Sequence, residues 1–223
     1  MKGIEISHCN AAIDAILVAY YALMNSTVEE ALRPVLAYGK SDTLGLDAMP
    51  EITIVERLQR YDSNAEVITE ECGLRKKQGF SQNEFPRRFR MIFISDPTDR
   101  SAQFKEFLET CDKKEKIVDV VRGETHRQRW EDKHGTPASI TGSTSAITCV
   151  CGGTPIFSVI ANYITQELFV SCSAGNYVLN LPYQMKSIDL NYVRSHARPL
   201  IFPSISSPKL GDMRRFVTFM GKT

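Results

Sequence analysis

The sequence carries almost no excess charge of either sign. Its 223 residues include 27 lysines and arginines against 26 aspartates and glutamates, a formal net charge of +1. A protein that holds a nucleic-acid polymer or an anionic membrane surface usually presents a strong positive field. We therefore expect neither a nucleic acid polymer nor a membrane as a partner.

Cysteine is also scarce, and the six cysteines are scattered without the spacing of a disulfide scaffold. Such usage is typical of a reducing compartment, so we expect a cytoplasmic protein. Cys149 and Cys151 share one face of an expected strand, because side chains alternate along a strand. No further ligand cluster lies near them in the sequence, which favours core cysteines over a metal site.

Long apolar runs are missing as well. The run at residues 15–19 is too short to span a bilayer. Asp14 precedes it, Lys2 is its only positive flank, and no convincing cleavage site follows, so we expect no signal peptide. With 43% hydrophobic and 24% charged residues, the chain has an ordinary globular composition and the length for one large domain or two small ones.

What the sequence does contain is an acidic turn after a buried strand. Residues 91–94 are apolar and predict that strand, which ends at Asp96 and Pro97 because proline cannot continue a ladder. Asp96 and Asp99 lie in the turn that follows and can converge on one point. Two such carboxylates repel one another unless a cation lies between them, and a hard divalent cation bound by oxygen ligands is the usual solution.

Two further acidic features precede this turn. Apolar periodicity predicts helices over residues 7–24, 27–37 and 48–60, with an interruption at Pro34. Residues 44–47 read as a short strand, and Asp47 is placed to cap the third helix, which is a sufficient role for it on position alone. Glu70 and Glu71 end a short strand at Val67 and Ile68, either as a solvated acidic loop or as ligands at a strand end.

The remaining chain divides into a helical and a strand-rich part. Apolar residues predict helices after Ser101, and the charged stretch 123–135 contains the single tryptophan and two histidines, His126 and His134, that we expect at the surface. The basic stretch 74–90 either attracts a phosphate or forms a solvated loop. Strands are predicted over residues 139–151, 155–164, 167–173, 177–181 and 215–220.

Several of these features together carry a family resemblance. They are Asp-Pro-Thr-Asp at 96–99, Glu-Glu at 70–71, Gly-Thr-Pro at 153–155, Glu-Leu-Phe at 167–169, and Gly175 followed by Asn180. In this order they resemble, over residues 4–183, the inositol monophosphatase and fructose-1,6-bisphosphatase superfamily of magnesium-dependent, lithium-sensitive phosphatases.

The resemblance implies an α+β fold, a layered sandwich of N-terminal helices on an antiparallel sheet. It implies one domain over residues 1–223, with a helical part at 1–60, the metal motif at 65–104, a helical insertion at 104–135, the meander at 138–183 and a late strand at 215–220. The family's C-terminal α/β domain would be missing or truncated.

The resemblance also implies roles for the acidic residues. Glu70, Asp96 and the backbone carbonyl of Thr98 would hold a first Mg²⁺, and Asp96 and Asp99 would share a second; a role for Glu71 stays open. Asp47 and Ser101 would be the catalytic pair that orients and deprotonates the attacking water. Backbone N–H groups of Arg100, Ser101 and Ala102 would receive the phosphate.

Two departures from the family pattern bear on activity. Arg100 stands where the family has glycine, and it would either bind phosphate or block the site. The family's later Trp-Asp motif is absent, since Asp189 and Asp212 follow the meander without a preceding tryptophan. The sequence is thus either the N-terminal part of a longer protein or a shortened relative, and we expect weak magnesium binding and poor hydrolysis from these residues alone.

The functional hypothesis is magnesium-dependent hydrolysis of a phosphate monoester of a small sugar, inositol or nucleotide. The alternative is a catalytically weak or inactive relative that acts as a binding or regulatory module. The expected partner is a small phosphorylated substrate. Its identity and the oligomeric state stay open, with a homodimer as one alternative.

Overall fold

The structure is a computed structural model that describes residues 2–35, 42–62, 65–71, 73–75, 91–122, 124–182, 184 and 186–199. The predicted strand at 215–220, Asp212 and most of the basic stretch 74–90 lie outside these described residues. So do the last residues of the predicted second helix.

A single mixed sheet forms the centre of the described part. Its strands are β1 (Glu66–Thr69), β2 (Gly73–Arg75), β3 (Met91–Asp99), β4 (Thr144–Cys151), β5 (Thr154–Asn162), β6 (Glu167–Cys172), β7 (Gly175–Asn180) and β8 (Arg198–Pro199). Their order across the sheet is β2-β1-β3-β4-β5-β6-β7-β8. Every neighbouring pair is antiparallel except β1 and β3, which run parallel. The predicted antiparallel meander is thus present, with one parallel pair beside it.

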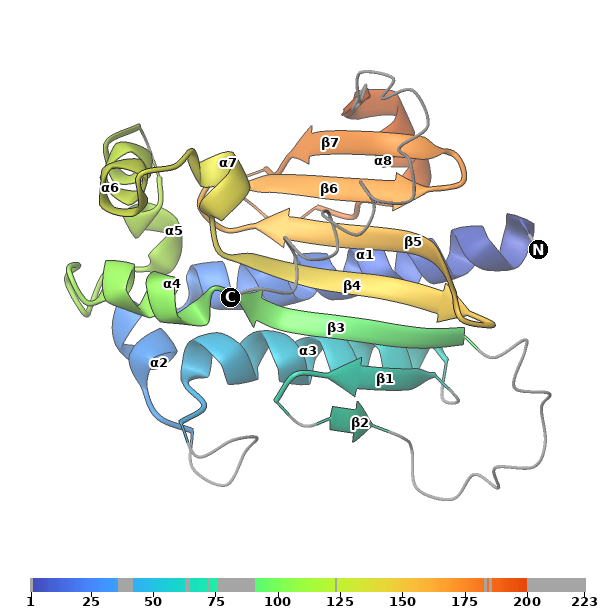
Figure 1. Ribbon diagram of the computed structural model, residues 1–223, viewed down its shortest axis with the longest axis horizontal. Coiled ribbons are helices and arrows are strands. Elements are labelled where there is room, and N and C mark those ends of the chain that lie inside the picture. The colour runs from blue at the N-terminus through green and yellow to red at the C-terminus, as the bar shows by residue number, and fades with distance from the viewer. Residues whose placement is uncertain are drawn as a thin grey trace, which may run out of the picture.

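The helices are α1 (Lys2–Asn25), α2 (Val28–Leu32), α3 (Gly45–Tyr61), α4 (Ser101–Leu108), α5 (Ile117–Val120), α6 (Glu124–His134), α7 (Ala138–Thr141) and α8 (Leu190–His196). Helices α1 and α3 lie side by side on one face of the sheet, α1 against β4 and β5 and α3 against β3 (Figure 1). The shorter helices α4 to α7 gather at one end of the sheet. This is the predicted layered α+β architecture.

Helix α1 is a core helix, because it packs against both α3 and the sheet. Its apolar side chains Ile13, Ile16 and Leu23 are fully buried, and apolar residues occur nearly all round it, as is typical of a helix enclosed by protein. By length and composition alone Glu5–Asn25 could cross a membrane, but 56% of its most apolar window is buried inside the protein.

The start of α3 corrects one prediction. Residues 44–47 were expected to form a strand with Asp47 capping the next helix, whereas α3 begins at Gly45 and Asp47 lies in its first turn. A Cβ atom at Gly45 would lie 2.2 Å from the carbonyl oxygen of Glu30, so only glycine allows this close approach to α2. Leu44 forms only an isolated bridge with Pro34.

Two further predictions are corrected in the second half of the chain. Residues 138–141, expected at the start of a strand, form the short helix α7, and β4 begins only at Thr144. His126 and His134, expected at the surface, are half-buried. Their helix α6 packs the fully buried Trp130 against Phe107, and the His134 ring lies 4.5 Å from the Trp130 ring.

Candidate metal and phosphate site

The parallel pair β1 and β3 determines where the acidic residues meet. Thr69 is paired with Ser95, so both strands end at the same edge of the sheet. Helices α3 and α4 begin at this same end, where β3 leads directly into α4 (Figure 1). Carboxyl ends of strands beside helix N-termini are the usual place for ligands in sheets of this kind.

Hydroxyl groups at the start of β4 form hydrogen bonds with the backbone of the acidic turn. The strand that was predicted to end at Asp96 and Pro97 instead continues through Asp99 as β3, so this prediction is corrected. Its register with β4 shifts between Asp96 and Asp99, and the acidic turn is therefore a bulge at the end of β3. Ser143 Oγ donates to the Asp99 carbonyl at 2.8 Å, and Ser145 Oγ donates to the carbonyl of Pro97. These bonds fix the backbone of the turn to the segment that begins β4.

Thr98 joins this turn to α3. Pro50 lies inside α3 and has no N–H, so it cannot donate to the Leu46 carbonyl one turn earlier. The Thr98 hydroxyl, which is buried, donates to that Leu46 carbonyl at 2.7 Å. The bond that the helix lacks is therefore replaced by one from the acidic turn, which fixes the turn beside the start of α3.

Asp96 is the most perturbed carboxyl of the site. Burial, together with the negative charges of Asp99 and Glu70, raises its pKa to about 7, against the lowering effect of the Thr98 N–H. Its Oδ1 atom is buried and has no hydrogen-bond partner among the residues that the structure describes. A buried carboxylate oxygen without a donor, among other carboxylates, is what a cation site presents when protein groups alone surround it.

Asp47 and Ser101 form the pair that the family resemblance implies. The Ser101 hydroxyl donates to the Asp47 carboxylate, which also accepts from the Leu44 N–H at 3.4 Å. Burial nevertheless raises the pKa of Asp47 to about 6, with help from the negative charges of Glu71 and Glu70. Asp47, Glu70, Asp96 and Asp99 thus act on one another electrostatically as one cluster.

Glu51 is a site residue that sequence reasoning missed. It lies one helical turn after Asp47 and its side chain is completely buried. Its carboxylate accepts from the Thr69 hydroxyl at 2.8 Å and from the Glu71 N–H at 3.1 Å, so it ties the end of β1 to α3 and positions the Glu-Glu pair. Its spacing of four residues from Asp47 on one helix face was the available signal.

Glu71 and Arg100 lie at the margin of the cluster. Glu71 accepts a hydrogen bond from the Thr43 hydroxyl, so its carboxylate is oriented by the segment before α3. Arg100 has φ 61° and ψ 37°, the left-handed conformation that glycine adopts most easily. Its guanidinium is near enough to His134 to contribute, after burial and Lys133, to lowering the pKa of that histidine.

The geometry brings the predicted residues together without completing a metal centre. Among the described residues, no group of three or more His, Cys, Asp or Glu side chains is arranged to hold a metal ion as it stands. The unpartnered Asp96 oxygen and the oxygen-only donor set nonetheless fit a hard cation such as Mg²⁺. The predicted ligand roles of Glu70, Asp96, Thr98 and Asp99, and the phosphate-binding roles of residues 100–102, stay predictions.

These features define an α+β protein with an acidic site at the carboxyl ends of a parallel strand pair. The chain has the fold of the inositol monophosphatase family, and its partial coverage of the solved structures fits the N-terminal part of such a chain.

Three solved structures illustrate the likeness. CysQ from Bacteroides thetaiotaomicron, a bacterial member of that family, has a TM-score of 0.53 and 17% identity, over 96% of this chain and 68% of its own. SuhB from Bartonella henselae has a TM-score of 0.48 and 19% identity, over 78% and 52%. The inositol monophosphatase from Anabaena has a TM-score of 0.46 and 16% identity, over 78% and 47%.

Comparisons of the sequence alone find no relative. No protein-family model matches the sequence, and no curated protein matches it. The chain spans about two thirds of CysQ and about half of the other two structures.

Proposed function

We propose that this chain provides the phosphatase site for magnesium-dependent hydrolysis of a phosphate monoester of a small sugar, inositol or nucleotide. The observation that carries the proposal is the buried, unpartnered Oδ1 of Asp96 within a cluster of carboxylates at the ends of β1 and β3. A small phosphorylated substrate, a cytoplasmic location and inhibition by lithium are the further expectations.

The ligand set is the one that the family resemblance implies, and its oxygen donors suit a hard cation. Glu70, Asp96 and the Thr98 carbonyl would hold a first Mg²⁺, and Asp96 with Asp99 would contribute to a second. When bound, magnesium would neutralise negative charge on the phosphoryl oxygens. The proximity of these side chains supports this set, because Glu70 forms a side-chain hydrogen bond with Asp96 and the charge of Asp99 helps to raise the pKa of Asp96.

The chain's own groups account for the proton transfer and for phosphate orientation. The Asp47 carboxylate accepts a hydrogen bond from the Ser101 hydroxyl, so the pair can position a water and take its proton. Ser101 is the first residue of α4, whose free N–H groups at residues 101 and 102 can donate to a phosphate. The partial positive charge of the helix terminus adds to this attraction.

A second candidate function is a binding or regulatory module with little or no turnover. It is favoured by Arg100 at the family's glycine position and by the incomplete convergence of the ligands within the described residues. Such a module would bind magnesium and a phosphate group at the same cluster without the water being activated.

One experiment separates the two functions. Phosphate release is measured with inositol phosphate, fructose bisphosphate and adenosine bisphosphate at saturating Mg²⁺, for the natural protein, for Asp96→Asn and for Asp14→Asn on the exposed side of α1. Under the proposed function, Asp96→Asn lowers turnover more than about 100-fold, beyond the 10–100-fold typical of groups that only orient ligands. Asp14→Asn leaves it unchanged, and lithium lowers it.

The opposite result is equally specific. If Mg²⁺ and phosphate raise the thermal midpoint of the natural protein but not of Asp96→Asn, and no phosphate is released, the binding module is correct. If neither ligand binds, the acidic cluster is not a metal site.

A further inference from the structure

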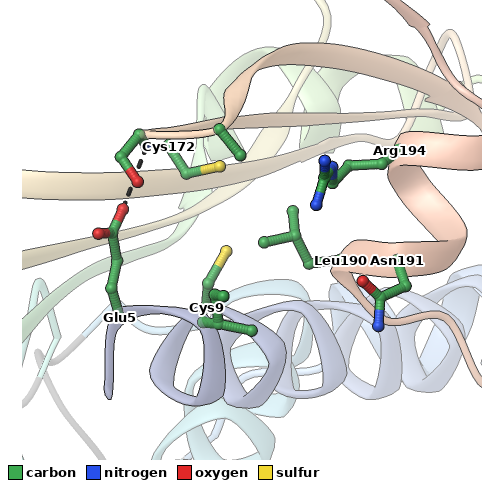
Figure 2. A pocket seen from close by; sticks show the side chains of 9 residues that line it. Glu5, Cys9, Cys172, Leu190, Asn191 and Arg194 are labelled. Carbon is green, nitrogen blue, oxygen red and sulfur yellow. Dashed lines mark hydrogen bonds between the residues drawn. The ribbon is translucent and has the colours of Figure 1, made fainter. Parts of the chain in front are cut away.

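A second site lies at the other end of the sheet, far from the acidic cluster. It is a pocket of about 220 Å³ between the first turns of α1, the turn after β6 and the helix α8. Its wall includes Glu5, Cys9, Cys172, Leu190, Asn191 and Arg194 (Figure 2). Two cysteines that are far apart in the sequence thus share one cavity.

The two sulfur atoms lie on the wall of one pocket, as Figure 2 shows, and hydrogen bonds on either side hold the segments that carry them. The interaction between the two side chains raises the pKa of Cys9 and lowers that of Cys172. Glu5, one turn before Cys9, accepts from the Ser173 N–H at 3.1 Å. Asn10 accepts from the Leu190 N–H at 2.8 Å, so α1 is bonded both to the turn after β6 and to the start of α8.

The surroundings make the two thiols unequal. The hydrogen bond from Cys9 lowers the pKa of Cys172 to about 6, assisted by the N–H groups of Ala174 and Gly175 and opposed by burial. The same hydrogen bond and its own burial raise the pKa of Cys9. The protonated Cys172 thiol also donates weakly to the Gly175 carbonyl, with 3.8 Å between sulfur and oxygen. This contact does not offset the effect of Cys9 and of the Ala174 and Gly175 N–H groups, which lower the pKa of Cys172. Cys172 is half-buried and borders the pocket, whereas Cys9 is fully buried.

We infer that Cys172 and Cys9 form a peroxide-reactive thiol pair that closes a reversible disulfide between β6 and α1. The inference rests on two facing sulfurs in one pocket, one reachable and one enclosed, on elements that are already bonded to each other. It concerns a modification site that is separate from the acidic cluster and independent of the proposed phosphatase activity.

The chemistry balances with a peroxide as the oxidant. The Cys172 thiolate attacks one peroxide oxygen, the O–O bond breaks, and the leaving hydroxide takes a proton to give water. This step leaves a sulfenic acid on Cys172. The Cys9 sulfur then attacks the Cys172 sulfur, and its proton leaves with the departing hydroxide as a second water. Two thiols are oxidised, one peroxide is reduced, and a small dithiol reverses the reaction by exchange.

The other described cysteines serve as internal comparisons. Burial, with a smaller contribution from Cys151, raises the pKa of Cys149 to about 12. Cys111 is half-buried near the end of α4, and its sulfur contacts the Phe107 carbonyl at 3.5 Å. A thiol that stays protonated reacts slowly with peroxide, so Cys149 is expected to stay reduced.

The test is disulfide mapping on the whole reduced protein after treatment with hydrogen peroxide, followed by denaturation, alkylation and peptide mass spectrometry. Loss of two of the six thiols, a peptide pair joined through Cys9 and Cys172, and full recovery with dithiothreitol support the inference. Retention of all six thiols, or a link that joins other cysteines, overturns it.

Three variants sharpen the result. Cys172→Ser is expected to prevent disulfide formation, and Cys9→Ser to leave a sulfenic acid on Cys172 that dimedone traps. Cys111→Ser is the matched control and should behave like the natural protein. Because Cys9 is buried, Cys9→Ser is first checked by circular dichroism, and the mapping on the natural protein decides the matter if that variant does not fold. Equal dimedone labelling of the natural protein and Cys9→Ser would overturn the resolving role of Cys9.

Discussion

At the scale of single residues, Asp96 couples the stability of the protein to pH. Its folded-state pKa of about 7 lies above the ordinary value of 3.8, mainly because the carboxyl is buried. Between these values the folded state holds a proton that the unfolded state releases. Rising pH therefore favours unfolding across this window.

We expect the free energy of unfolding to fall by on the order of 2–4 kcal/mol between about pH 4 and pH 7 when divalent cations are removed with EDTA. Asp96→Asn cannot ionise and should remove most of this slope, raising stability at pH 7. Urea unfolding at several pH values measures the effect.

Asp14→Asn, on the exposed side of α1, is the control and should keep the slope. Added Mg²⁺ should restore stability at pH 7 in the natural protein and not in Asp96→Asn. A slope that survives in Asp96→Asn would show that other carboxyls cause it.

Arg100 is a second residue that affects the stability of the protein, through its backbone conformation. A left-handed conformation is unfavourable for a residue with a Cβ atom, and φ at Arg100 is 61°. We expect Arg100→Gly to raise the free energy of unfolding by about 1 kcal/mol, because glycine adopts this conformation without the steric cost. Denaturant titration at fixed pH measures the difference.

Arg100→Ala is the matched control, because it removes the guanidinium and keeps the Cβ atom. If alanine stabilises as much as glycine, the cost at this position comes from the charge of the arginine and not from its backbone. The same pair of variants, assayed for phosphate release, tells whether Arg100 binds phosphate or blocks the site.

At the scale of elements, the hydrogen bond from Thr98 in β3 to the Leu46 carbonyl in α3 connects a helix to the acidic turn. We expect Thr98→Val to cost about 1–3 kcal/mol, because the buried Leu46 carbonyl then has neither a helical donor nor a hydroxyl. Pro50→Ala restores the helical N–H, so the double variant should lose less than Thr98→Val alone.

Thr53→Val serves as the control on the same helix. The Thr53 hydroxyl also donates to a carbonyl one turn earlier, that of Met49, at 2.8 Å. That carbonyl can accept from the helix backbone, so the change should cost less than about 0.5 kcal/mol. Additive effects of Pro50→Ala and Thr98→Val would contradict the proposed exchange of donors.

Elements with a strong pattern were predicted well, and elements set by tertiary contacts were not. The helices on the N-terminal side and the meander strands follow from apolar spacing alone. The start of α3 does not, because it depends on the backbone of Glu30 lying where any Cβ at Gly45 would clash. The parallel pairing of β1 with β3 could not be predicted either, because the local sequence of neither strand indicates its partner.

In the candidate site too, some residues could be predicted from the sequence pattern and others depend on tertiary contacts. The acidic turn and the Glu-Glu pair stand out as charged residues at strand ends, where a polar pattern is informative. Glu51 does not stand out, because a glutamate on a helix usually faces solvent, and its burial follows only from β1 packing against α3. The orphaned oxygen of Asp96 depends on burial by several elements at once.

At the scale of the whole molecule, aromatic rings connect the layers. Tyr163 stacks on Tyr20 of α1 and on Phe104 of α4, with ring centroids 5.6 Å apart in both pairs. Phe104 in turn contacts Trp130 of α6 at 6.4 Å. One buried cluster thus extends from the first helix through the sheet to the charged helix α6.

We therefore expect the described part of the chain to unfold cooperatively, as the predicted single domain would. Trp130, the only tryptophan, reports on the α4–α6 end, and far-ultraviolet circular dichroism reports on all elements. Their urea transitions should coincide. Two separated midpoints would show that the α4–α6 end unfolds on its own and would contradict the single domain.

The packing of α1 has a consequence for protein synthesis. Some of its partners are made much later: Tyr21 donates to the Pro182 carbonyl at 2.6 Å, and Asn10 accepts from the Leu190 N–H. During translation α1 emerges before the sheet does, and its apolar surface has no sheet to cover it until β4, β5 and the segment before α8 have followed. The nascent chain therefore exposes its most hydrophobic helix longest, which makes α1 the segment that a ribosome-associated chaperone would be expected to hold.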